Sequence, residues 1–170
     1  MSVADPTPNQ PSPGEPLPAQ AGSVKRGSAR TKARKRALDI LFEADLRQLP
    51  VAEVLAARTA EADPPVRPFT AELVTGVEAH RGELDAILAD LLQAGWTLDR
   101  MPRVDRNLAR LASFEVLHTD IDPSIALSEC VALATDLSTD SSPAFLNGLL
   151  ASVLTGNSAR SGPATPPSGD

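Results

Sequence analysis

The sequence contains few of the residues on which many folds and active sites depend. It has no tyrosine, one tryptophan and four phenylalanines, so aromatic residues make up 3% of its 170 residues. A core must therefore be built mainly from leucine, alanine and valine, which favours closely packed helices over a β-sandwich. The single cysteine, Cys130, excludes an intramolecular disulfide and is typical of a reducing, cytoplasmic compartment.

Membrane segments and catalytic motifs are also missing. No apolar run approaches the roughly 18 residues that a membrane-spanning helix needs, and the first residues contain no apolar signal core. The two histidines, His80 and His118, lie far apart in the sequence and have no cysteine or paired carboxylates at ligand spacing. Because a Ser-His-Asp pattern, a glycine-rich phosphate loop and a dinucleotide fingerprint are absent as well, we expect no enzymatic activity, metal site or cofactor.

What the sequence does contain is a sharply uneven charge. The net charge of −6 combines a basic segment, residues 25–36, with an acidic body. The segment holds seven lysines and arginines and no acid, whereas residues 37–159 hold 8 basic and 19 acidic residues, a net of 8 − 19 = −11. A concentrated basic segment indicates a polyanionic partner such as RNA, although a solvated charge run at a helix end has the same composition.

Composition divides the chain into three parts. Residues 1–24 contain six prolines among small and polar residues, and residues 158–170 contain three prolines and two glycines. Neither segment has enough apolar surface to offset its ordering entropy, so we expect both to be disordered. The one folded domain is then expected over residues 25–157.

The body of the chain has helical periodicity throughout, so the predicted fold class is all-α. Apolar residues recur at three-to-four spacing, and prolines, glycines and polar loops separate the runs. Ser28 is a candidate N-cap for the first helix, and Gly76 and Gly82 are candidates for a close helix approach or a bend within the third. The expected helices cover residues 28–48, 51–62, 69–94, 102–118, 123–137 and 143–154.

Several motifs occur in a fixed order along these helices. The first expected helix carries Arg34-Lys35-Arg36-Ala37-Leu38-Asp39-Ile40-Leu41-Phe42, and the last carries Phe145-Leu146-Asn147-Gly148-Leu149-Leu150. Between them stand Trp96-Thr97-Leu98-Asp99-Arg100-Met101, Val104-Asp105, Leu108-Ala109-Arg110-Leu111-Ala112, Phe114-Glu115-Val116-Leu117 and Ile125-Ala126-Leu127-Ser128-Glu129-Cys130-Val131-Ala132-Leu133-Ala134.

This series resembles the NusB transcription antitermination factors over roughly residues 32–154. The resemblance implies a compact fold of about six to seven helices in two packed helical bundles. It also implies a function: with NusE, a small-subunit ribosomal protein, such factors bind the boxA element of nascent ribosomal RNA transcripts and help RNA polymerase resist termination. The sequence departs from the family pattern at Phe42, where many members have tyrosine, at Ser128, where asparagine is usual, and at Pro143.

The candidate RNA-binding residues fall into two groups. Lys32, Arg34, Lys35 and Arg36 are expected to contact phosphates, and four such contacts give a slope near −3 for log K against log salt with a single strand. Close to the polar loop before the last helix, the resemblance places Ser141, Phe145 and Asn147 near the RNA. Core packing is an alternative for Phe145, and a structural role, in which its side chain caps or bridges backbone groups, is the alternative for Asn147.

Four further residues are candidates for contacts with RNA or with a protein partner. Arg110 either pairs with a carboxylate such as Asp105 or Glu115 or reaches a phosphate. By position in the family pattern, Phe42, Asp105 and Glu115 are candidates for the NusE surface.

The sequence also allows a second function and two oligomeric states. The acidic body also suits a helical adaptor that binds protein without direct RNA contact. Leucine-rich helices with an aromatic-poor surface permit either a monomer or a homodimer.

Overall fold

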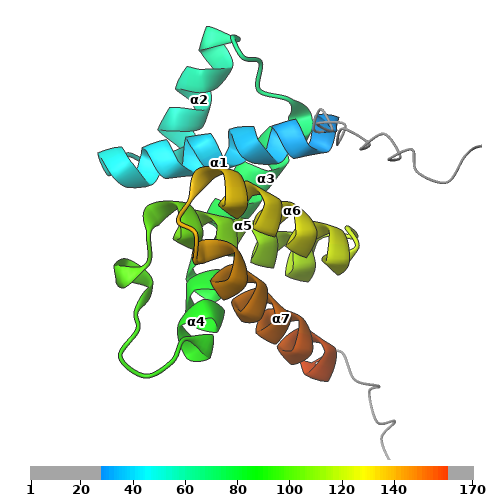
Figure 1. Cartoon of the computed structure of the whole chain (residues 1–170). Helices are drawn as coiled ribbons and strands as arrows, with labels where there is room; N and C mark the ends of the chain where they lie inside the picture. Colours follow the sequence, from blue (N-terminus) through cyan, green and yellow to red (C-terminus); the bar gives the residue numbers. More distant parts are fainter. Residues whose placement is uncertain (1–27, 161–170) are drawn as a thin grey trace, which may run out of the picture.

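The computed structural model describes residues 28–160, with side chains described as far as Asn157. In this part of the chain seven α-helices and one 3-10 turn occur and no strand, so the all-α prediction is confirmed (Figure 1). The predicted N-terminal tail, residues 1–24, and the end of the chain beyond Arg160 lie outside the described residues. The elements are α1 (Ala29–Arg47), α2 (Val51–Glu61), α3 (Pro68–Ala79), α4 (Arg81–Leu91), η1 (Leu98–Arg100), α5 (Arg103–His118), α6 (Pro123–Leu137) and α7 (Ser142–Arg160).

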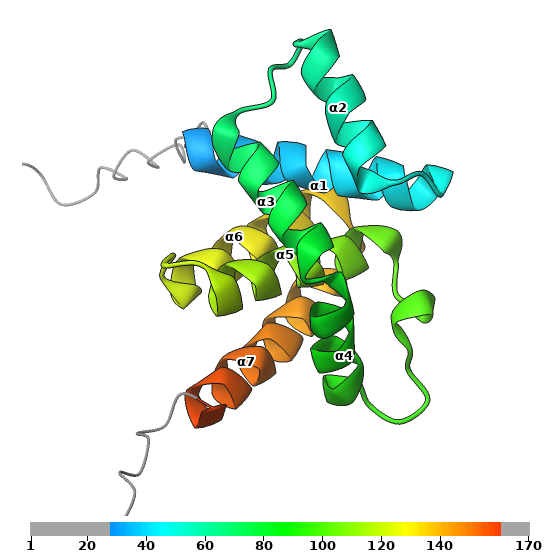
Figure 2. The ribbon, with the colours of Figure 1, turned by 180° about the vertical axis from the view of Figure 1, so that it is seen from behind.

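Helix α5 lies at the centre of the molecule. Every residue from Asp105 to Val116 is buried, and α1, α3, α4, α6 and α7 all pack against this helix. Figures 1 and 2, which view the fold from opposite sides, show these five helices around it, with α2 farther out beyond α1. A helix buried on all sides has no solvated face, so its polar residues must find partners within the protein.

Two apolar cores share this central helix. One is formed by α1, α2 and α3 around Ile40, Leu73 and Val77, and it takes Leu111 and Phe114 from α5. The other is formed mainly by α6 and α7 with Leu88 of α4, and it takes Leu108 and other residues from α5, together with Met101. The two cores correspond to the two packed bundles expected from the resemblance.

The helix predicted over residues 69–94 is wrong as a single element. The chain leaves the helical path at His80, where φ is −103° and ψ is 9°, and α4 starts in a new direction at Arg81 (Figure 2). Leu73, Val77, Leu84 and Leu88 keep helical spacing across the break and are all buried, so the periodicity alone gives no sign of it. The last helix also differs from the prediction, because α7 continues to Arg160 and therefore includes the first residues of the predicted C-terminal tail.

The ends of α1 are fixed by side chains. The Ser28 hydroxyl accepts the backbone N–H of Thr31 at 3.1 Å, which confirms Ser28 as the N-cap. At the other end Arg58 of α2 and Arg47 of α1 both bind Glu43, at 2.6 Å each. The Arg58 hydrogen bonds, supported by Arg47, lower the pKa of Glu43 to about 2.

The single thiol is part of the core. Cys130 of α6 is buried, and its Sγ donates to the carbonyl oxygen of Leu108 at 3.7 Å. Burial raises the pKa of this thiol to about 12, with smaller contributions from the carboxylates of Asp105 and Glu115.

Within residues 28–160, none of the helices combines the length and apolar character needed to span a bilayer.

A substitution at Gly76 tests the contact between α3 and α5. A Cβ at this position would lie 2.0 Å from Cζ of Phe114. Overpacking of this kind costs about 1–3 kcal/mol, more than the gain of up to about 1 kcal/mol from removing a helical glycine. We expect Gly76→Ala to lower Tm in thermal unfolding. In Gly82→Ala, the matched control, the new Cβ meets nothing within 4 Å, so Tm should hold or rise. A Gly76→Ala protein as stable as the wild type would contradict the packing described here.

Candidate nucleic-acid interface

A basic groove lies beside the N-terminal half of α1. Lys32 and Lys35 are exposed there, and Arg36 lines the groove from the same helix. Its other wall comes from the segment between α2 and α3, which contributes Pro64, Pro65 and Arg67, and from Thr70 in the first turn of α3. The groove encloses about 280 Å³ and holds four cationic side chains against a single carboxylate, that of Asp39. Such a surface attracts anions.

Lys35 and Arg36 make only weak ion pairs or hydrogen bonds within the protein. Lys35 Nζ lies 3.2 Å from Asp39 in an exposed pair, which is worth little in water. Arg36 donates from one terminal nitrogen to the Pro64 carbonyl oxygen at 3.4 Å, while its buried Nε has no hydrogen-bond partner. Because the hydrogen bond to Pro64 is long, the terminal nitrogens of the Arg36 guanidinium remain able to bind a phosphate oxygen.

Arg34, predicted as a phosphate contact, faces inward instead. It is 2% exposed, and its Nε and Nη2 donate to the Glu115 carboxylate of α5 at 2.9 and 2.7 Å. Glu115 is equally enclosed at 1% exposed, so its predicted place on a partner surface needs correction as well. The pair is bidentate and buried, which suits a contact that holds α1 against α5.

Arg110 is likewise committed to the fold. Its Nε and Nη2 donate to the two carboxylate oxygens of Asp85 at 2.6 and 2.9 Å, and Arg110 is 5% exposed. Of the two interpretations left open for Arg110, the structure therefore agrees with a carboxylate partner. The partner comes from α4, however, and is neither Asp105 nor Glu115.

Asp105, a predicted partner residue, is buried beneath the loop between α6 and α7. Its carboxylate accepts the Ser138 hydroxyl at 2.5 Å and the Ser142 hydroxyl at 2.7 Å. These bonds fix both ends of the loop that leads into α7. Asp105 therefore positions the loop and presents no carboxylate to a partner.

Two exposed aromatic rings lie at the start of α7. Phe145 is 39% exposed and Trp96 is 54% exposed, and their ring centroids are 6.4 Å apart. The Arg100 guanidinium lies over the Trp96 ring at 5.9 Å. A hollow of about 410 Å³ extends from this pair along α4 and α7. Unpaired bases stack on surfaces of this kind.

The remaining predicted residues lie in different places. Ser141 and Asn147, which flank Phe145 in the sequence, are exposed, and Phe42 is half-buried on α1. In Figure 1 the basic end of α1 lies at the upper right, whereas the first turn of α7 lies near the centre. The basic groove and the aromatic pair are therefore two separate patches, and they share no lining residue.

Comparison with known proteins identifies the family. The model of the NusB family matches residues 31–155. The chain belongs to the NusB family. The transcription antitermination protein NusB of Cutibacterium acnes is 57% identical over 133 residues, which are 78% of this chain and 51% of that protein. The NusB of Acidothermus cellulolyticus is 52% identical over 143 residues, 84% of this chain and 97% of that protein.

A solved structure of the family is similar in fold. The crystal structure of the antitermination factors NusB and NusE in complex with double-stranded RNA contains a chain that is 25% identical, with a TM-score of 0.66. The alignment covers 75% of this chain and 96% of that chain. The present chain spans about half the length of the Cutibacterium acnes relative, and nearly all of the other two.

Membership of the NusB family does not by itself locate these side chains. Arg67 follows a proline-rich break and belongs to no helical stripe, so no sequence signal linked it to the basic residues of α1. Trp96 could be recognised as one of few aromatic residues, but its position beside Phe145 depends on how the α4–α5 connection packs on α7.

Removal of the Glu115 charge tests whether the buried pair is structural. Glu115→Gln would leave the buried Arg34 guanidinium without its hydrogen-bonded carboxylate, and only Glu129, at 3.8 Å, would remain as an anionic neighbour. Breaking a buried pair in this way typically costs about 3–5 kcal/mol. We expect a large loss of unfolding free energy in urea denaturation. Asp39→Asn, which breaks only the exposed pair with Lys35, should change it by less than about 0.5 kcal/mol. Equal stability of the two variants would show that the Arg34–Glu115 pair does not hold the fold.

Proposed function

We propose that this protein is a transcription antitermination factor that pairs with NusE and binds single-stranded boxA-type RNA in nascent ribosomal RNA transcripts. Family membership supports the antitermination role, since the relatives of known name are transcription antitermination proteins. A relative of the same fold is known in complex with NusE and RNA. Acting on nascent transcripts beside RNA polymerase, the protein would work in the cytoplasm.

The observation that carries the proposal is the basic groove. It concentrates Lys32, Lys35, Arg36 and Arg67 in one place on a chain whose net charge is −6. A purely protein-binding adaptor has no need for such a concentration, whereas phosphate contacts dominate the affinity of RNA-binding proteins. We assign phosphate binding to these four residues, with Arg67 in place of the buried Arg34.

The aromatic pair is the second part of the proposed RNA surface. Phe145, with Trp96 beside it, offers rings to splayed bases, and the exposed Ser141 and Asn147 offer hydrogen bonds to base edges. Because Asp105 holds Ser138 and Ser142, this surface is ordered before RNA binds. An RNA segment that touches both patches must cross the surface between the basic end of α1 and the start of α7 (Figure 1).

The residues that would contact NusE are assigned separately from those that would contact RNA. Of the predicted partner residues, Asp105 and Glu115 are buried, and we therefore keep only the half-buried Phe42 as a candidate.

Salt dependence tests the groove. Four phosphate contacts give a slope near −3 for log K against log salt, about 0.7 per contact on a single strand. Reversing Lys32 and Arg36 to glutamate should therefore make the slope shallower by about 1.4 and weaken binding of a boxA-like RNA, with NusE present, in fluorescence anisotropy. Arg47→Glu, at the other end of α1, is the control and should keep the wild-type slope. A double variant with an unchanged slope would remove the groove from the interface.

Stacking is tested separately by Phe145→Ala. Loss of one stacked base costs about 1–3 kcal/mol, and because no charge is removed, the salt slope should stay the same. Leu46→Ala removes a comparably exposed apolar side chain from α1 and should leave the affinity unchanged. If Phe145→Ala binds RNA as tightly as the wild type, Phe145 is not a stacking residue.

A further inference from the structure

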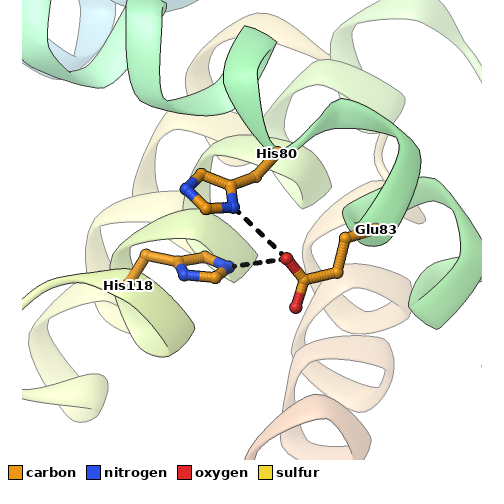
Figure 3. A group of neighbouring side chains, drawn as sticks. All are labelled: His80, Glu83 and His118. Atoms are coloured by element: carbon orange, nitrogen blue, oxygen red, sulfur yellow. Dashed lines mark hydrogen bonds and ion pairs between the residues drawn. The ribbon is translucent and has the colours of Figure 1, made fainter.

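Three metal-ligating side chains converge where α3 meets α4 (Figure 3). His80 stands between the two helices, Glu83 lies in the first turn of α4, and His118 is the last residue of α5. The two histidines lie far apart in the sequence, without cysteine or paired carboxylates at ligand spacing, and no metal site was expected from them. The packing of α5 against α3 and α4 removes that separation.

The three donor atoms have the spacing of ligands around one ion. His80 Nδ1 and His118 Nε2 each lie 3.2 Å from the same Glu83 oxygen, Oε2, and the three atoms all lie within 4.8 Å of one another. A tetrahedral zinc ion with bonds of about 2.0–2.1 Å separates its ligand atoms by about 3.3 Å. The imidazole rings stack at 3.7 Å and 23°, and each presents a ring nitrogen to the same Glu83 oxygen (Figure 3).

The donor set is also suitable. Two imidazoles and one carboxylate suit zinc and neighbouring divalent transition ions, and three protein ligands leave a fourth position for water. The His118 side chain is 23% exposed, that of His80 37% and that of Glu83 51%, so an ion can reach the group from solvent. Behind it the Phe114 ring lies 5.8 Å from each imidazole and closes the inner side with an apolar surface.

The surrounding charge favours a cation. Residues 68–91, which form α3 and α4, include five acidic residues and one basic residue. That residue, Arg81, points toward Glu78 at 3.5 Å, which partly compensates its charge. A divalent ion at the three ligands would therefore meet a negative local field.

We propose that His80, Glu83 and His118 bind one divalent transition-metal ion of the zinc class. The ion lies between the two imidazoles and Glu83, and a ring nitrogen binds a metal only when it carries no proton. It joins the junction between α3 and α4 to the end of α5. Leu84, next to Glu83, packs in the same apolar core as α3, whereas Leu88 packs in the other core, so the ion fixes the end of α5 beside the point where α4 passes from one core to the other.

Titration of the full chain, without any added histidine segment, tests the proposal. With Zn²⁺ in isothermal calorimetry we expect one saturable site per chain and a higher Tm in its presence. With Co²⁺ we expect visible d–d absorption bands of a low-symmetry site. Loss of a second-shell partner already weakens metal sites about 10–100-fold, so each of His80→Asn, His118→Asn and Glu83→Gln should lose at least about tenfold in affinity.

Two controls separate this site from other donors. Cys130→Ala removes the only thiol and Glu78→Gln removes a neighbouring exposed carboxylate, and both should bind Zn²⁺ like the wild type. Far-ultraviolet circular dichroism of each variant establishes that it is folded, and Glu83→Gln is the safest of the three because its side chain is half exposed. Absence of saturable Zn²⁺ binding at about 100 µM, or binding that the three ligand variants leave unchanged, would overturn the proposal.

Discussion

Charge compensation around the buried helix α5 is the constraint on which the rest of the structure depends. Arg106, Arg110 and Glu115 of α5 are all buried, and each would be costly without a partner. Asp45 and Arg34 of α1 and Asp85 of α4 supply the partners. Burial would raise the pKa of Asp45, but the hydrogen bond and charge of Arg106 hold it below its usual value. The pairs fix how α1 and α4 lie against α5, and thus where the basic groove and the α3–α4 junction stand.

Much of the fold was predictable because five of the expected helices begin at strong local signals. Ser28, Pro50, Pro102, Asp122-Pro123 and Ser142-Pro143 mark helix starts at positions close to those observed. The break at His80 has no such signal, since apolar spacing continues across it and neither Gly76 nor Gly82 stands at the junction. Gly76 instead allows the Phe114 ring to approach α3, a contact between residues remote in sequence. That kind of information is absent from local patterns.

The candidate site was predictable as a region but not side chain by side chain. The basic run on α1 locates the groove, yet Arg34 shares the buried stripe of Leu38 and Leu41, whereas Lys32 and Lys35 do not. The helical spacing alone could have separated these residues. By contrast, nothing in the sequence pairs Glu115 with Arg34, Arg67 with α1, or His80 with His118. Those contacts depend on how α5 and the proline-rich segment pack, which only the tertiary structure provides.

The buried position of Cys130 has a practical consequence for following this molecule in solution. A thiol attacks disulfides and maleimides as the thiolate, and a pKa of about 12 leaves Cys130 almost wholly protonated at neutral pH and enclosed by α5. A cysteine placed on the surface would therefore be the one reactive handle. Fluorophores attached at chosen positions on α1 and α7 can then report how an RNA strand runs between them, with the native residue left in place.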